Sequence, residues 1–212
     1  MNPIIKVTIN EDGFWMGEIA IYSPPLENII FDEDDKYKLN DLINYYNDKI
    51  GKLIINDAVN ISQIQNHIYD FCFSSLCLEH IANPLKAINE WLRIIKNDGY
   101  IIIIVPEKSE CSDHRRDYST FSTLLSQYDN NIGEDDLSTL PEIISKHDFS
   151  MDTHAPDVEQ FTKRSLDNFT NRCLHHYVYN LDLLMQICLF FNCEFIYTET
   201  IGLNIWFIMK KT

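Results

Sequence analysis

The clearest pattern of hydrophobic and polar positions lies between residues 69 and 106. Tyr69–Ser74 (YDFCFS) is a short aromatic-rich run, and Tyr100–Val105 (YIIIIV) is a continuous apolar run that ends at Pro106. Between them, apolar positions recur at helical spacing after Pro84, a residue that suits a first helical turn; they are Leu85, Ile88, Trp91, Leu92 and Ile95. A strand that is apolar throughout is typical of a parallel sheet covered by helices. The pattern predicts a βαβ unit and therefore the α/β fold class.

Shorter patterns predict further elements towards both ends of the chain. Brief strands are expected at residues 4–9, 19–22, 52–56, 194–200 and 205–209, and the last two form a closing hairpin. Helices are expected near residues 39–46, 121–128, 137–146 and 181–191. Asn97-Asp98-Gly99 is expected to stop the central helix, with Gly99 in the left-handed cap conformation.

The order of these elements predicts a single domain over residues 1–212. Residues 1–51 form an atypical N-terminal segment, and residues 107–180 form a polar, mostly helical and irregular insertion that carries most of the histidines. A chain of 212 residues buries roughly 70% of its unfolded surface, which is enough for an apolar core without disulfides.

Composition narrows the classes of partner. The chain has 17 Lys and Arg against 32 Asp and Glu, for a net charge of −15. Phosphates repel such a surface, so we expect no nucleic-acid partner and no anionic membrane partner. No signal peptide or membrane-spanning apolar run is visible, and the six cysteines form no C-x-x-C pair. These features predict a cytoplasmic protein with reduced thiols.

A family resemblance starts at Leu78-Glu79-His80-Ile81. The run from Tyr69 to Lys108 (YDFCFSSLCLEHIANPLKAINEWLRIIKNDGYIIIIVPEK) resembles the central part of class I S-adenosylmethionine-dependent methyltransferases. Later blocks resemble a bacterial subgroup associated with sugar or surface-glycan modification; they are Asp113-His114-Arg115-Arg116, Gly133-Glu134-Asp135-Asp136, His147-Asp148 and Arg172-Cys173-Leu174-His175-His176. The resemblance covers about residues 52–195, and it implies a truncated Rossmann-like sheet.

The resemblance also implies a binding region for S-adenosylmethionine at the carboxyl ends of the strands, where α/β sheets bind ligands. Backbone groups of Ser74, Ser75 and Leu76 can meet the amino-acid end of the cofactor, and Asp57, next to Ala58, can accept a hydrogen bond from the adenine amino group. Glu79 and His80 open the next connection, where they either contact the substrate or have a loop or helix-cap role.

The insertion supplies candidates for substrate chemistry. His114 can deprotonate a sugar hydroxyl with Asp113 orienting it, and Arg115 with Arg116 can bind a phosphate or carboxylate. The alternative for these four residues is an ion-pair cluster that holds the insertion down.

Two further groups in the insertion are candidates. His175 and His176 are adjacent and therefore point in different directions, so we expect at most one of them to be a catalytic base or metal ligand; we assign His176 to catalysis and His175 to substrate binding, against a structural alternative. Glu134-Asp135-Asp136 can hold Mg²⁺ or form a solvated helix start; we favour the helix start, assign no residue to a metal, and leave metal dependence open.

One departure from the family pattern leaves two functions open. The six glycines, at positions 13, 17, 51, 99, 133 and 202, form no GxGxG cofactor loop. Either the protein O-methylates a sugar, nucleotide sugar or surface glycan with an unusually held S-adenosylmethionine, or it is a degenerate relative that no longer binds this cofactor. The latter would act as a non-catalytic partner or in other sugar chemistry. A missing βαβ unit exposes a strand edge and apolar helix faces, which predicts a homodimer.

Overall fold

The structure is a computed structural model that describes residues 3–4, 18–22, 52–53, 57–152 and 154–212. Its centre is a five-stranded mixed sheet of order β2-β4-β5-β7-β6. The strands are β2 (Glu18–Tyr22), β4 (Tyr69–Ser75), β5 (Ile95–Pro106), β7 (Asn204–Lys210) and β6 (Glu194–Ile201). A separate parallel pair joins β1 (Pro3–Ile4) to β3 (Lys52–Leu53).

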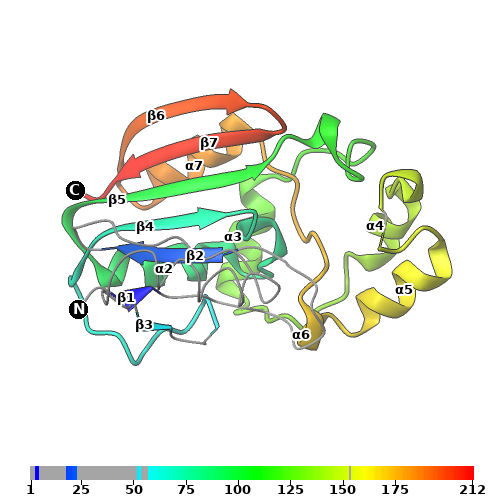
Figure 1. The fold of residues 1–212 in the computed structure, drawn as a ribbon, viewed down its shortest axis with the longest axis horizontal. Coiled ribbons are helices and arrows are strands. Elements are labelled where there is room, and N and C mark those ends of the chain that lie inside the picture. The colour runs from blue at the N-terminus through cyan, green and yellow to red at the C-terminus, as the bar shows by residue number, and fades with distance from the viewer. Residues whose placement is uncertain (1–2, 5–17, 23–51, 54–56, 153) are drawn as a thin grey trace, which may run out of the picture.

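Helices follow in chain order around this sheet. The α-helices are α2 (Pro84–Ile94), α3 (Phe121–Asp129), α4 (Leu140–Lys146), α5 (Val158–Leu166), α6 (Asn168–Asn171) and α7 (Leu181–Phe190). Three short 3₁₀ turns are η1 (Leu78–His80), η2 (Lys108–Glu110) and η3 (Phe149–Met151). Helix α3 contacts both α2 and α7, and α2 and α7 also pack against strands of the sheet (Figure 1). The fold is therefore α/β, as the sequence predicts.

The predicted βαβ unit is present as β4, α2 and β5. Strand β5 pairs in parallel with β4 and antiparallel with β7, so it lies inside the sheet as its apolar run predicts. Helix α2 begins at Pro84 behind an Asn83 cap and buries Trp91 and Ile88 completely. Together with Phe207 of β7, these side chains belong to one continuous apolar core.

The connection from α2 to β5 differs from the expected turn. The strand starts at Ile95, directly after the helix, and the left-handed residue is Asp98 rather than Gly99. Gly99 is instead needed for space, because a Cβ there would lie 2.8 Å from the carbonyl oxygen of Lys96 and 2.9 Å from that of Asp70. The predicted role of Gly99 is wrong, and close backbone approach explains the glycine.

Other expectations are confirmed with shifted ends. Helix α7 and the hairpin of β6 and β7 lie where the sequence predicts them, and α4 starts at Leu140 rather than at residue 137. The expected helix at 39–46, the glycines at 13, 17 and 51, and most of the strand at 4–9 lie outside the described residues. From the sequence, a missing βαβ unit is expected to leave a strand edge exposed. Strand β2 pairs antiparallel with β4 and covers the edge of β4 on this side of the sheet.

Residues 107–180 include a helical lobe, defined here by α4, α5, α6 and the segments between them. Figure 1 shows α4 and α5 standing away from the sheet. Four residues of the lobe and Leu174, which follows α6, form a small apolar cluster; the four are Leu140, Ile143, Ala155 and Phe161. In the described parts of the chain, no helix is long and apolar enough to cross a membrane.

Candidate functional site

The candidate site lies beyond the carboxyl ends of β4 and β5, the two parallel strands. Turn η1 follows β4, and Asp113 lies seven residues after the end of β5. The segment between α6 and α7, which includes residues 172–180, runs past the ends of these two strands (Figure 1). The backbone N–H of His176 donates to the carbonyl of Glu79 at 2.8 Å, and the Tyr177 hydroxyl donates to the carbonyl of Ala82 at 2.7 Å. These bonds hold residues 172–180 against η1, at the position where α/β sheets bind ligands.

Asp113 and His175 form the central pair of this site. Asp113 is buried, and its carboxylate accepts a hydrogen bond from His175 Nδ1 at 2.5 Å and one from Arg116 Nη1 at 2.9 Å. Burial raises the pKa of Asp113, but the charge and hydrogen bond of His175 and the Arg116 guanidinium outweigh it, so the net pKa is well below its usual range. For His175, burial lowers the pKa, and the Asp113 carboxylate more than reverses this. Asp113 therefore holds His175 in one orientation and stabilises its protonated form.

Arg116 acts as a structural anchor for this pair. Its guanidinium also donates to the backbone carbonyls of His175 at 2.8 Å and His176 at 3.2 Å, and the side chain is buried. Nη1 and Nη2 of Arg116 serve Asp113 and the backbone, so these two atoms are not available for the phosphate or carboxylate that the sequence analysis expects Arg116 to bind. The ion-pair alternative is confirmed for Asp113 and Arg116.

Glu79 and His80 meet His175 from the side of η1. Both are buried, at 2% and 5% exposure, and Glu79 Oε2 and His80 Nδ1 have no hydrogen-bond partner within the described chain. Burial raises the pKa of Glu79 to about 7, and burial together with the neighbouring His175 lowers that of His80 well below its usual value. The rings of His80 and His175 meet edge to face, with centroids 4.4 Å apart. We call Glu79, His80, Asp113 and His175 the acid–imidazole centre.

His114 belongs to a different cluster. Its Nε2 lies 2.9 Å from Asp148 Oδ2, which also accepts a hydrogen bond from Arg115 at 2.6 Å. Asp148 further accepts bonds from the backbone and hydroxyl of Ser150. The expected pairing of Asp113 with His114 is therefore wrong, because Asp113 orients His175, the residue that the sequence assigned only to substrate binding.

His176 points away from His175, as adjacency predicts. Its Nε2 lies 3.3 Å from Glu134 Oε2 and 3.1 Å from Asn168 Nδ2. Glu134 is buried; it accepts a hydrogen bond from the backbone N–H of Ala82 at 2.8 Å and forms an ion pair with Arg172 at 3.1 Å. The expectation of a solvated helix start is wrong for Glu134, which joins the helical lobe to the loop after β4.

Some of the residues that the sequence analysis assigns to cofactor binding have polar groups that a ligand could contact. Ser74 is buried at the end of β4, and its hydroxyl has no hydrogen-bond partner among the described residues, so it is a polar group available to a ligand. Ser75 ends β4, and the backbone N–H of Leu76 donates to the carbonyl of Ile104. Asp57, beside the buried Ala58, forms an ion pair with Arg172 at 3.1 Å, so a bond to adenine would compete with this arginine.

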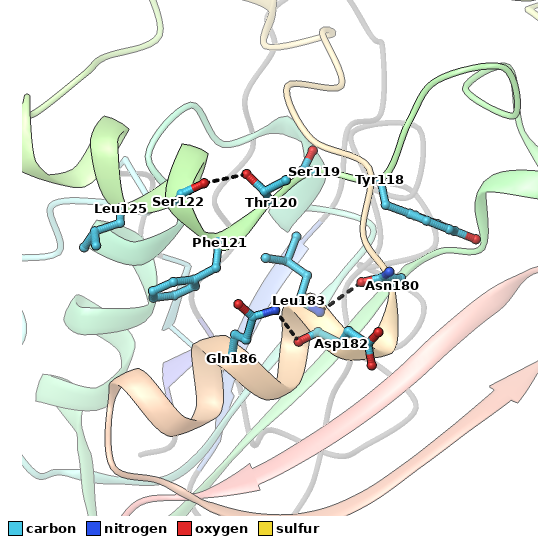
Figure 2. Close-up of a pocket in the computed structure, with 10 residues that line it drawn as sticks. All are labelled: Tyr118, Ser119, Thr120, Phe121, Ser122, Leu125, Asn180, Asp182, Leu183 and Gln186. Atoms are coloured by element: carbon cyan, nitrogen blue, oxygen red, sulfur yellow. Dashed lines mark hydrogen bonds between the residues drawn. The ribbon is translucent and has the colours of Figure 1, made fainter.

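The structure also contains a hollow that the sequence patterns do not predict. It has a volume of about 520 Å³ and lies between the N-terminal ends of α3 and α7 (Figure 2). Thr120 and Asn180 cap these helices at its wall, and Tyr118, Phe121 and Gln186 contribute further side chains. None of the predicted site residues lines it. The cap residues Thr120 and Asn180 are the only signal in the sequence, and they mark helix starts rather than a cavity.

Known proteins resemble parts of this chain. Residues 36–103 match a family model described as a methyltransferase domain, which covers 68 of the 212 residues. No protein of curated function matches the chain. One similar solved structure is a SAM-dependent methyltransferase of Thermotoga maritima, with histamine N-methylation as its suggested activity; the TM-score is 0.40 and the identity 11%, over 81% of this chain and 70% of that one.

A second similar structure is a Methanococcus maripaludis protein provisionally assigned as an S-adenosyl-L-methionine-dependent methyltransferase. It has a TM-score of 0.39 and 15% identity, over 84% of this chain. The chain spans 62% of that protein's length. Both similarities are too low to carry a conclusion about this protein. The family-model match covers β4, α2 and most of β5, so the chain is methyltransferase-like in the segment that bears Ser74, Glu79 and His80.

Proposed function

We propose that the protein is an S-adenosylmethionine-dependent O-methyltransferase that acts on a hydroxyl of a sugar, nucleotide sugar or surface glycan. The observation that carries the proposal is the acid–imidazole centre, which lies beyond the carboxyl ends of two parallel strands in the methyltransferase-like segment. Burying Glu79, His80 and Asp113 beside the partly buried His175 costs free energy, and such clusters gather at functional sites. The sugar class of the acceptor rests on the resemblance of the histidine-containing blocks alone.

Ser74, Ser75 and Leu76 would hold the cofactor at the end of β4, and the unpartnered Ser74 hydroxyl supports this position. When bound, S-adenosylmethionine supplies an electrophilic methyl group.

The residues of this chain handle the acceptor proton. His175 uses Nδ1 to bond Asp113, so its Nε2 is the ring nitrogen that can take a proton from the acceptor hydroxyl. Once its proton passes to His175, the acceptor oxygen would be able to bond the methyl carbon that bound S-adenosylmethionine would supply, with S-adenosylhomocysteine as the leaving group. The Asp113 carboxylate stabilises the imidazolium that results.

One observation favours the alternative of a degenerate relative. Asp57, the expected acceptor for the adenine amino group, is occupied by Arg172. In this alternative, residues 172–180 block the cofactor side, and the protein no longer transfers methyl groups.

Calorimetric titration of the full chain with S-adenosylmethionine and S-adenosylhomocysteine separates the two functions. We expect saturable binding of both, and transfer of a labelled methyl group to a member of a nucleotide-sugar panel. His175→Gln should abolish transfer and retain binding, whereas the control His154→Gln, on an exposed residue of the lobe, should retain both. Absence of binding at millimolar ligand, where mass action would reveal even weak sites, would overturn the proposal in favour of the degenerate relative.

We also propose that the protein is a homodimer. Strand β6 ends the sheet, and it exposes Phe195, Ile196, Tyr197 and Ile201 at 41–48% of their surfaces. An apolar edge strand of this kind favours pairing with another strand. Light scattering of the purified chain should give a mass of twice 24.9 kDa, and a clean monomer would contradict this.

A further inference from the structure

Three side chains capable of binding a metal ion converge in the acid–imidazole centre. Glu79, His80 and His175 each bring one ligand atom, and these atoms all lie within 4.8 Å of one another. In a tetrahedral zinc site, bonds of about 2.0–2.1 Å place neighbouring ligand atoms roughly 3.4 Å apart. Small inward movements of the side chains would therefore place all three atoms around one ion.

Two of these side chains have buried polar atoms without a partner. Glu79 Oε2 and His80 Nδ1 lack a hydrogen bond to any described residue, although almost all buried polar atoms of proteins have one. Hydrogen bonding to the backbone of Glu79 lowers the pKa of Glu79, and hydrogen bonding to the backbone of Leu174 raises that of His80, but burial outweighs both effects. A neutral imidazole with its proton on Nε2 has a lone pair on Nδ1, the unpartnered atom of His80. A cation can accept the lone pairs of both atoms at once.

The third side chain is oriented by a carboxylate behind it. His175 donates Nδ1–H to Asp113, which leaves the lone pair of Nε2 for a ligand. Metal-binding histidines almost always donate their other ring N–H to a carboxylate, a carbonyl or water. Asp113 is itself held by Arg116, so the orientation of His175 is fixed before any ion binds.

We propose that Glu79, His80 and His175 bind one divalent transition-metal ion, with Asp113 as the positioning residue for His175. Two imidazoles and one carboxylate favour Zn²⁺ and Co²⁺ over Mg²⁺, which prefers oxygen ligands. Three protein ligands leave a fourth position open, as in catalytic zinc sites. The partly exposed His175 places this position at the border with solvent. From the sequence, no residue is assigned to a metal and metal dependence is left open, and this proposal names the ligands.

The metal proposal stands independently of methyl transfer, because binding of the ion is measured directly. A proton and a metal ion exclude one another on His175 Nε2. In the metal-loaded protein, the ion would therefore replace His175 in activating the acceptor hydroxyl.

The test uses the full chain after treatment with a chelator. Calorimetry with Zn²⁺ should show one ion per chain, and Mg²⁺ should give no response. The absorption spectrum with Co²⁺ should lack a thiolate-to-metal charge-transfer band, which distinguishes this site from one made by the six cysteines. Glu79→Gln and His80→Asn should remove the site, Asp113→Asn should weaken affinity about 10–100-fold, and His154→Gln should leave it unchanged.

Three results would overturn the proposal. They are absence of saturable Zn²⁺ binding, a thiolate band with Co²⁺ that disappears in Cys111→Ser, and unchanged affinity in both Glu79→Gln and His80→Asn. Circular dichroism of each variant shows whether it is folded. If the variants do not fold, the proposal is still tested by the Zn²⁺ stoichiometry and the Co²⁺ spectrum of the unaltered chain, because these measurements require no substitution.

Discussion

The sheet and the helical lobe beyond it are stabilised by different interactions. The sheet with α2 and α7 encloses one large apolar cluster, in which Trp91, Ile103 and Phe207 are completely buried. The lobe has only a small apolar cluster, which partly buried ion pairs such as Asp152 with Arg164 supplement. The buried pair of Asp113 and Arg116 lies next to the lobe, with Arg116 Nε 3.4 Å from Glu142 of α4. Apolar burial is non-directional, whereas each buried charge requires a specific partner. The sheet is thus built for stability, and the residues with chemistry lie where the polar contacts begin.

The largest expected effect is in the sheet. Trp91→Ala removes a completely buried side chain from the apolar cluster and should lower the free energy of unfolding by about 4 kcal/mol. Urea denaturation followed by circular dichroism measures the change. A loss below about 1 kcal/mol would show that α2 does not depend on this contact and would weaken the comparison.

A similar but smaller loss is expected where a buried charge loses its partner. Asp113→Ala leaves the Arg116 guanidinium buried without its carboxylate, which should cost about 3 kcal/mol. The matched double variant Asp113→Ala with Arg116→Met should recover part of the loss, because it removes both charges. If the double variant is no more stable than Asp113→Ala, the buried charge is not the cause.

A third variant tests the connection between α2 and β5. Gly99→Ala places a Cβ within 3 Å of two backbone oxygens, which cannot move as a flexible side chain can, and should cost about 2 kcal/mol. The control is Gly133→Ala, whose closest contact is the side chain of Asp135. Equal thermal stability of the two variants would contradict the crowding at Gly99.

These variants also show which features the sequence could predict. The β4–α2–β5 unit was predictable because apolar spacing reports burial directly, and Pro84 marks the helix start. The pairing of Asp113 with His175 was not predictable, because His114 is the histidine next to Asp113 in the sequence. In the fold, the turn that bonds the Arg116 N–H to the Asp113 carbonyl brings Arg116 to Asp113, and His175 reaches Asp113 from 62 positions away.

The left-handed residue at Asp98 shows a similar limit. Glycine is the residue that most readily adopts the left-handed conformation, but here Asp98 adopts it. The glycine is at position 99, where the carbonyl oxygen of Asp70 leaves no space for a Cβ. Close packing between segments that are distant in the chain determines such details, and a local pattern does not contain it.

The smallest effect is a difference in acid stability between the two regions. Burial raises the pKa of Asp152, but hydrogen bonds from His147 and Arg164 outweigh it and lower the net pKa below the ordinary 3.8. The stability that Asp152 contributes is therefore present above about pH 4 and is lost as the pH falls further. Below about pH 4, the amides of α5 should lose protection from hydrogen exchange before those of β5. The account would be contradicted if α5 and β5 lost protection at the same pH. It would also be contradicted if α5 still lost protection before β5 in the Asp152→Asn variant.

The most direct test of the acid–imidazole centre as a functional site is the stability of Glu79→Gln. Glutamine keeps the shape of Glu79, and it removes a buried carboxylate that lacks a partner at Oε2. In metal-free protein at pH 8, the free energy of unfolding should rise by about 1 kcal/mol, while Zn²⁺ binding is lost. A variant that is less stable than the unaltered chain would show that Glu79 serves the fold, and it would contradict a centre retained for chemistry.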